Sequence, residues 1–224
     1  MTTQQARLDE ARGRQPQAPA HWPLLSILAI CVTVFIVLSV DITHSGPLDR
    51  FDQRVARWAD GISGVVHTWS WHLTNLGDAG LLTTLIVFVA AYLLWRRRTS
   101  DAILLCVGAA VTGLLTTFLK LAFQRSRPPF VDHGRELHSF SFPSGHASGA
   151  FCVYLLFALL LSESRGPRWR AAAVIAGLGV AAVVAASRVL ILVHYLTDVI
   201  AGSAVGIAVA VATWVVRVTL RPQR

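Results

Sequence analysis

Charged side chains are scarce in this chain. Aspartate, glutamate, lysine and arginine together make up 14% of its 224 residues, and lysine occurs only once, as Lys120. Hydrophobic residues make up 54%, and the mean hydropathy is +0.56. So little charge excludes an ordinary soluble domain and indicates a multi-pass protein of the cell membrane.

Only three cysteines are present, each in a separate apolar run and without the spacing of metal ligands, so we expect buried small side chains rather than a zinc site or a disulfide. A continuous basic block is also lacking, although the net charge is +8, because the arginines recur in groups of three between apolar runs. That pattern is typical of a membrane-topology signal and argues against a nucleic-acid partner. The sequence indicates no protein partner.

Six apolar runs have about the length that a helix needs to cross a bilayer. They cover residues 24–40, 79–95, 102–123, 146–161, 171–187 and 199–216. We therefore predict an all-α fold, a bundle of six transmembrane helices over residues 23–220. In the last run, Gly202 and Gly206 have the G-x-x-x-G spacing that suits close helix packing within the bundle. Residues 1–22 are polar and are expected to be a disordered tail.

Arginine placement predicts the orientation of these helices. Twelve arginines lie on the side of the two termini and of the connections 96–101 and 162–170, whereas eight lysine or arginine residues lie on the other side. Setting aside three cations that are assigned to chemistry below leaves twelve against five. The positive-inside rule then places both termini, and the tail, in the cytoplasm.

The long connection 41–78 accordingly lies outside. Within it, the segment PLDRFDQRVARWAD begins with a proline suited to a helix start and carries apolar residues at helical spacing. These are Leu48, Phe51, Val55 and Trp58. We expect an amphipathic helix there, which either lies on the outer leaflet and guides lipid toward a site or only packs over the bundle.

Three polar motifs interrupt the apolar runs on the outer side. In the first, Lys120 and Arg127 are seven residues apart, nearly two helical turns, so they share a face if the helix continues that far. Pro128 opposes that continuation. Taken alone, the pair also fits two snorkelling cations at a helix end.

The second motif is FPSGHASG, residues 142–149, at the start of the fourth run. Ser144 is suited to be an N-cap, and a helix N-terminus with free N–H groups is an anion site, which Gly145 would let a ligand approach closely. His146 would then be placed to donate a proton. The alternative is an ordinary capped helix start.

The third motif is SRVLILVHYLTD, residues 187–198. His194 and Asp198 are one helical turn apart, so the carboxylate can hold one imidazole nitrogen and leave the other as a base or nucleophile. A purely structural His–Asp pair is the alternative. Arg188 precedes His194 by six residues, and a turn within residues 189–193 would bring the two together; the sequence leaves this open.

Together the motifs supply three cations, a helix N-terminus, two histidines and one carboxylate on the same predicted side. A cation at the centre of a membrane helix costs about 2.5–3.5 kcal/mol, and less near the interface, so this gathering indicates a function. The set suits a dianionic tetrahedral group, phosphate. Because Asp198 is the only acid in the motifs and no His-x-x-x-His pair occurs, we expect neither a metal nor another cofactor.

The motifs resemble the signature of the type 2 phosphatidic acid phosphatase superfamily, the membrane lipid phosphatases related to vanadium haloperoxidases. Its three parts, K-x6-R-P, P-S-G-H and S-R-x5-H-x3-D, are matched at every position, by residues 120–128, 143–146 and 187–198. The resemblance implies a metal-independent lipid phosphatase, and the arginine placement puts its active site on the extracytoplasmic side. In it, His194 would form a phosphohistidine, Asp198 would orient His194, and His146 would protonate the leaving oxygen and then activate water. The implied phosphate ligands are Lys120, Arg127, Ser144, Gly145 and Arg188.

Members of the family act on membrane lipids such as undecaprenyl diphosphate, phosphatidylglycerol phosphate and phosphatidic acid. An outward-facing site favours the polyprenyl diphosphate among these substrates. A haloperoxidase is disfavoured because those relatives are soluble. Two alternatives stay open: a lipid phosphotransferase with an acceptor other than water, and a non-catalytic protein that binds or transports anionic lipid. The intact set of His146, His194 and Asp198 disfavours the second, since binding needs no paired nucleophile and acid.

Overall fold

The computed structural model describes residues 22–44, 46–129 and 139–220, and every element within these ranges is a helix. In chain order they are α2 (Trp22–Thr43), α3 (Pro47–Asp60), α4 (Gly64–Thr74), η1 (Asn75–Gly77), α5 (Ala79–Trp95), α6 (Thr99–Phe123), α7 (Gly145–Leu161), α8 (Pro167–Leu190) and α9 (Leu196–Leu220). The predicted all-α class is confirmed. The predicted tail, apart from Trp22, lies outside the described residues.

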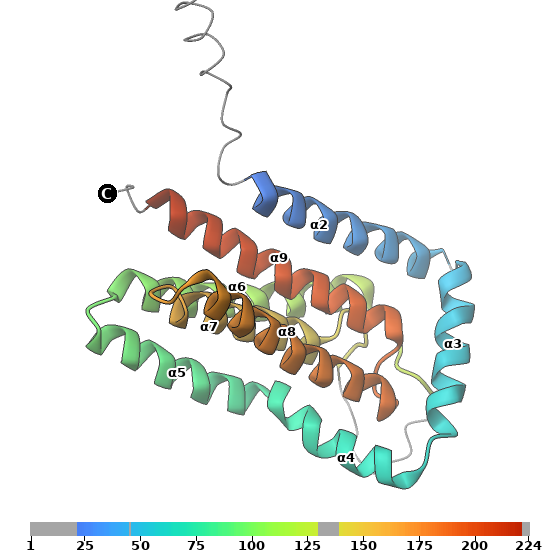
Figure 1. Cartoon of the computed structure of the whole chain (residues 1–224). Helices are drawn as coiled ribbons and strands as arrows, with labels where there is room; N and C mark the ends of the chain where they lie inside the picture. The colour runs from blue at the N-terminus through green and yellow to red at the C-terminus, as the bar shows by residue number, and fades with distance from the viewer. Residues whose placement is uncertain (1–21, 45, 130–138, 221–224) are drawn as a thin grey trace, which may run out of the picture.

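The long helices run side by side along the bundle, and α3 lies across one end of it (Figure 1). Helix α7 lies inside, packed against α6, α8 and α9. The approach of α9 is close: a Cβ atom at Gly202 would lie 2.4 Å from the backbone oxygen of Ser144, and one at Gly206 would lie 2.3 Å from that of Ser148. These glycines therefore pack within the bundle, and they hold the first turns of α7 against α9.

Within the described ranges, four helices, α2, α6, α8 and α9, are long and apolar enough to cross a membrane. A fifth span is obtained when the segment Gly64–Gly77 and α5, which meet at an angle of 42°, are taken together. Helix α7 has only 17 residues, about 26 Å at 1.5 Å per residue, because it begins at the buried turn around Ser144 rather than at the surface. Four to five of the six predicted spans are thus supported by length and composition, and the sixth stays a prediction.

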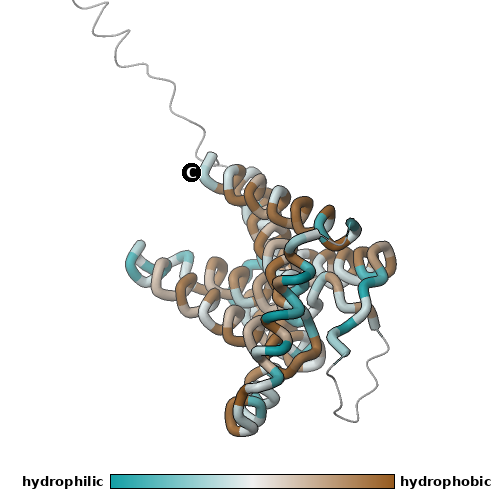
Figure 2. The backbone as a smooth tube through the Cα atoms, turned by 90° about the vertical axis from the view of Figure 1, so that its right-hand side faces the viewer, coloured by the Kyte–Doolittle hydropathy of each residue, from teal (hydrophilic) through white to brown (hydrophobic). Residues whose placement is uncertain are grey.

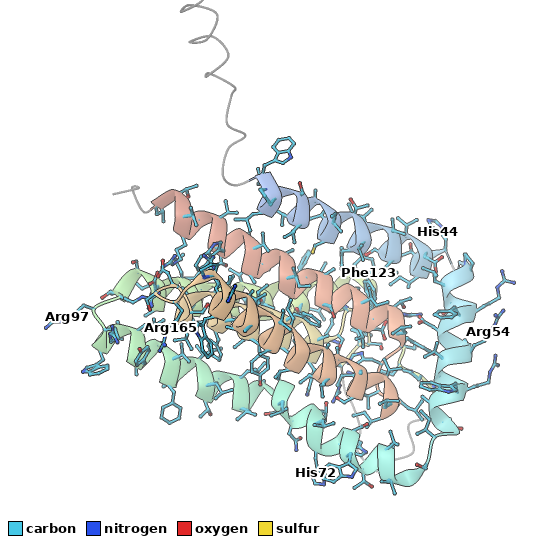
Figure 3. The ribbon with its side chains drawn as sticks, in the orientation of Figure 1. His44, Arg54, His72, Arg97, Phe123 and Arg165 are labelled. Atoms are coloured by element: carbon cyan, nitrogen blue, oxygen red, sulfur yellow. The ribbon has the colours of Figure 1, made fainter. Side chains whose placement is uncertain are left out.

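The two ends of the bundle differ in their side chains. Arg97 and Arg165 lie at one end, and His44, Arg54 and His72 lie at the other (Figure 3). We call these the Arg97 end and the α3 end. Viewed onto the α3 end, hydrophilic stretches of the chain come to the front, while the helices behind them are mostly hydrophobic (Figure 2).

Helix α3 packs over the bundle with a different face from the apolar one that its sequence predicts. Its buried residues are Asp52, Ala56 and Ala59, and Leu48 and Val55 are only partly buried. Phe51 and Trp58, which we predicted on the apolar face, are 46% and 63% exposed. The reason is that a charged side chain, Asp52, anchors the helix through buried polar contacts, so the apolar stripe is turned partly outward. Packing over the bundle is therefore established, and the exposed aromatic residues still suit a membrane interface.

Candidate active site

The three polar motifs line one cavity at the α3 end, with a volume of about 620 Å³. They reach it from the end of α6, the loop after α6, the first turn of α7, the end of α8 and the turn before α9. The motif residues that line it are Lys120, Arg127, Gly145, His146, Arg188 and His194. Of the eight predicted site residues, Ser144 and Asp198 do not line the cavity; both are fully buried beside those that do.

The three cations of the cavity are held by neutral groups. Lys120 Nζ donates to backbone oxygens of the loop before α7. Arg127 Nη1 donates to the Val193 oxygen at 2.6 Å, and Arg188 Nη1 donates to Thr74 Oγ1 at 2.8 Å, while the buried Nε of Arg188 has no hydrogen-bond partner. Among the residues that the structure describes, none of the three cations is paired with a carboxylate. Their mutual repulsion and spare donors would be relieved by an anion in the cavity.

The N-terminus of α7 faces the same cavity. Ser144 has the N-cap position that we predicted, with extended backbone angles, but its hydroxyl makes no capping hydrogen bond and is buried without a partner in the described part of the chain. A Cβ atom at Gly145 would lie 3.9 Å from the Cε atom of Lys120. The unsatisfied N–H groups and positive dipole end of this helix therefore lie next to the lysine, as an anion site requires.

A tight turn joins Arg188 and His194, which answers the question that the sequence left open. Helix α8 ends at Leu190, and Leu192 has a left-handed backbone with φ of 60°. The backbone N–H groups of Val193 and His194 both donate to the Arg188 oxygen, at 3.2 and 3.3 Å. The chain thus folds back on itself, and both side chains line the cavity.

His194 and Asp198 meet, although they do not share a helix as we expected, because α9 begins at Leu196. His194 Nδ1 lies 3.6 Å from Asp198 Oδ2, which is an ion-pair distance rather than a hydrogen bond. Ser141 Oγ lies 3.3 Å from the same nitrogen and donates a very short hydrogen bond to Asp198 Oδ2. On the other side of the ring, Nε2 lies 3.4 Å from Arg127 Nη1. Nε2 is therefore the nitrogen that faces the cations.

Burial lowers the pKa of His194 to about 3. The side chain is buried, with the residue only 3% exposed. Asp198 opposes the shift, whereas Arg127 and Arg188 add to it. The imidazole is consequently neutral at neutral pH, which is the state that a nucleophilic nitrogen requires.

The segment before α5 forms a wall of the cavity, although the sequence marks it only as part of a connection. A Cβ atom at Gly77 would lie 3.3 Å from the His146 ring and 2.4 Å from Val184 Cγ1, so only glycine fits there. Asp78 lines the cavity next to it, and Thr74 on α4 holds Arg188. This wall therefore sets the positions of His146 and Arg188.

Beyond the charged groups, the cavity continues as a largely apolar groove along α5 and α6. The small and apolar residues that line it are Leu82, Ile86, Ala109, Ala110, Gly113 and Val153. Cys106, which we expected to be buried, is exposed and lines the same groove. A charged head and an apolar groove within one cavity suit an amphiphilic ligand.

Sequence reasoning also missed Arg125, Ser141 and Asp52, which touch the catalytic motifs. Arg125 lies between Lys120 and Arg127 in the first motif, where its charge was the available signal. Ser141 and Asp52 contact the third motif only through the fold, so nothing in their local sequence marks them.

The comparisons with known proteins agree with this geometry. The family model described as the PAP2 superfamily matches residues 101–222, more than half of the chain. The chain belongs to the PAP2 superfamily. It is 36% identical over 182 residues to phosphatidylglycerophosphatase B of Bacillus subtilis, covering 77% of this chain and 86% of that protein. It is also 34% identical over 159 residues to a lipid A 1-phosphatase of Rhizobium johnstonii, covering 60% of this chain and 61% of that protein.

The fold of this PAP2 protein is similar to the crystal structure of a transmembrane PAP2-type phosphatidylglycerolphosphate phosphatase from Bacillus subtilis. The TM-score is 0.82 at 28% identity, over 88% of this chain and 98% of that chain. These relatives are lipid phosphatases, hydrolases that act on lipid phosphates. The predicted family and enzyme class are therefore confirmed, as is a multi-pass membrane protein with several apolar helices.

Proposed function

We propose that this PAP2 protein hydrolyses a membrane lipid phosphate or diphosphate through a phosphohistidine at His194, without a metal. The observation that carries the proposal is a single cavity in which three cations without a described carboxylate partner surround a neutral, buried histidine. The apolar groove that continues from this cavity suits the hydrocarbon chains of the substrate. Fixed cations supply the charge stabilisation that phosphoryl transfer requires.

In the first step, His194 Nε2 attacks the phosphorus atom and the bond from phosphorus to the leaving oxygen breaks. His146 donates its proton to that oxygen, so the lipid leaves as an alcohol or, from a diphosphate, as a lipid phosphate. Lys120, Arg127 and Arg188 hold the nonbridging oxygens, together with the Gly145 N–H. The Ser144 hydroxyl, which is buried beside the cavity without a partner among the described residues, joins them when the bound phosphate draws the first turn of α7 toward it. Asp198 stabilises the charge that develops on the ring of His194 from the side of Nδ1.

In the second step, water attacks the phosphohistidine. His146, now neutral, takes a proton from the water, the bond between phosphorus and Nε2 breaks, and inorganic phosphate leaves. His194 returns to its neutral state and His146 is protonated again, so the cycle closes with no net change in the protein.

For the substrate, the comparisons favour phosphatidylglycerol phosphate, because the Bacillus subtilis sequence and the Bacillus subtilis crystal structure are both named for that activity. Undecaprenyl diphosphate, which the sequence analysis favoured, and phosphatidic acid are the other two substrates to be tested. The lipid phosphotransferase differs only in the second step, where another acceptor replaces water. Release of free phosphate in the absence of any added acceptor excludes it.

The proposed topology has six spans, both termini in the cytoplasm, residues 1–22 as a cytoplasmic tail and the cavity on the extracytoplasmic side. It is supported by the separation of Arg97 and Arg165 from the α3 end (Figure 3). In a chain without native cysteines, Arg54→Cys should react with a membrane-impermeant maleimide on intact cells. Arg165→Cys should react only after permeabilisation. The reverse pattern would invert the topology.

Phosphate release from the lipid panel in detergent, with EDTA present, tests the function. We expect turnover without added metal, inhibition by vanadate, and loss of turnover by His194→Ala. Strict dependence on Mg²⁺ would overturn the metal-independent mechanism, and wild-type turnover by His194→Ala would remove the nucleophile.

A further inference from the structure

We infer that Arg125 is a positioning residue for the reaction, which fixes the Asp198 carboxylate behind His194 and ties it to helix α3 through Asp52. This inference rests on the proposed role of His194 as the nucleophile. Arg125 has no part in the three-part signature, and it does not line the cavity. Its effect on the reaction must therefore pass through the groups that it holds.

One terminal nitrogen of the Arg125 guanidinium contacts the first turn of α9, and the other contacts helix α3. Nη1 donates to Asp198 Oδ1 at 2.6 Å and to Thr197 Oγ1 at 2.7 Å. Nη2 donates to Asp52 Oδ2 at 2.9 Å and to Asp49 Oδ1 at 3.1 Å. One planar fork thus joins the first turn of α9 to α3.

Asp198 is surrounded so that it cannot turn. Oδ1 accepts from Arg125, while Oδ2 accepts from the Ser141 hydroxyl and from the Tyr195 N–H at 2.8 Å. The carboxylate is fully buried, so its charge needs a partner in the protein. His194 lies at 3.6 Å, farther than Arg125, and Arg125 is therefore the cation that keeps Asp198 ionised before His194 acquires charge.

Asp52 completes the link from the side of α3. Its Oδ1 accepts from the Thr197 N–H at 3.0 Å, and its Oδ2 accepts from both Arg125 and the Thr197 hydroxyl. The side chain is fully buried. Without Arg125, the carboxylates of Asp52 and Asp198 would face the same buried space with like charge, and Asp198 would be free to move away from His194.

A lysine cannot replace this arginine. The four contacts need two nitrogens in a fixed plane, and the ring of Tyr195 stacks against that plane, 4.4 Å from the Arg125 Cζ atom. A lysine would keep the positive charge, but its single nitrogen could contact only some of the four acceptor atoms. The identity of the residue, and not its charge alone, is thus part of the inference.

The test measures kcat, KM and the rate of acid-trapped phosphoenzyme formation for Arg125→Ala, Arg125→Lys and Asp52→Asn. We expect Arg125→Ala to lower kcat and the trapping rate by about 10- to 100-fold, with KM changed by less than about threefold. Arg125→Lys should recover part of kcat, and Asp52→Asn should lose about three- to tenfold. Arg57 is an exposed arginine on α3, the helix that carries Asp52. Arg57→Ala is therefore the matched control and should keep wild-type kcat.

A double-mutant cycle separates positioning from general structural support. In an Asp198→Asn background, Arg125→Ala should cost less than about threefold more, because its route to the reaction is already lost. A full, multiplicative loss in that background would overturn the inference. If Arg125→Ala does not fold, wild-type kcat in both Arg125→Lys and Asp52→Asn would overturn it as well.

The failure of the inference is distinct from that of the proposed function. An active His194→Ala variant removes the nucleophile and overturns both. An inactive His194→Ala variant together with full kcat in Arg125→Ala and Asp52→Asn overturns the role of Arg125 alone.

Discussion

The Arg97 end and the cavity at the α3 end use arginine in opposite ways. At the Arg97 end, Arg217 is buried and donates to Asp101 Oδ1 at 2.7 Å, while Arg98 donates to Asp101 Oδ2 at 2.6 Å and to Glu163 at 2.9 Å. At the α3 end, the cations of the cavity are held by hydroxyl and backbone oxygens. The first set pairs positive charge with carboxylates, whereas the cations of the second have no carboxylate at ion-pair distance among the residues that the structure describes.

The difference shows what separates a structural charge cluster from a candidate phosphate site. Buried arginine beside a carboxylate satisfies both groups and has no use for a ligand. Buried cations held only by neutral oxygens repel one another and favour a bound anion. Burial and residue type are similar in the cavity and at the Arg97 end, so the partners of each arginine are what distinguish the two places.

Breaking the α3 end should have the larger effect on activity. Arg188→Ala removes a cation held for the substrate, and we expect phosphate release to fall by about 10²- to 10³-fold, as for loss of one group that stabilises transition-state charge. The thermal unfolding temperature should stay the same or rise, because repulsion within the cavity is relieved. Phosphate assays and thermal unfolding in detergent check this. A large loss of stability would show that Arg188 is structural.

Breaking the Arg97 end should have the reverse effect. Arg217→Ala leaves Asp101 buried with less compensation, and we expect the free energy of unfolding to fall by about 3 kcal/mol. Turnover per folded molecule should stay within about twofold. Arg217 and Arg170 both stack on the Trp214 ring, with their Cζ atoms 4.5 and 4.9 Å from its centroid. Arg170→Ala is therefore a suitable control and should cost only about 0.5–1 kcal/mol. Equal losses of stability would contradict a special role of the buried ion pair.

The smallest expected effect is that of pH on the nucleophile. A histidine with its usual pKa of about 6.5 would slow phosphoenzyme formation by about 25-fold between pH 7 and pH 5, through loss of the neutral form. Because the pKa of His194 is lowered to about 3, we expect a change of less than about threefold in single-turnover trapping with an aryl phosphate, whose leaving group needs no proton from His146. A 25-fold decrease would show that His194 titrates normally. The same shift implies that stability is lost from about pH 6.5 downward, since only the unfolded chain gains that proton.

The residues of the candidate site could be predicted from the sequence more completely than the course of the backbone that positions them. The order of the apolar runs and the placement of the arginines predicted one side of the membrane for Lys120, Arg127, His146, Arg188 and His194, and all five line the cavity. These residues can be found because their types are improbable within apolar runs. The turn that joins Arg188 to His194 could not be predicted, because residues 189–193 are apolar and fit a helix equally well.

Long-range polar contacts were beyond prediction for a different reason. Arg125 and Asp52 are far apart in the chain, and each has an ordinary local role, as one of several outer arginines and as the polar side of an amphipathic helix. Only the packing of α3 over the bundle brings them to 2.9 Å. The burial of Asp52 then decides which face of α3 is turned inward, against its apolar pattern.

The most direct test of the account is to trap the enzyme during turnover and locate the phosphoryl group. A lipid phosphate labelled with ³²P is mixed with the protein in detergent and EDTA, quenched under conditions that preserve phosphohistidine, and the labelled peptide is identified by mass spectrometry. We predict label on His194 in the wild-type protein and in Arg57→Ala, and none in His194→Ala. Product formation with no label on His194, or with label on another residue, would contradict the account.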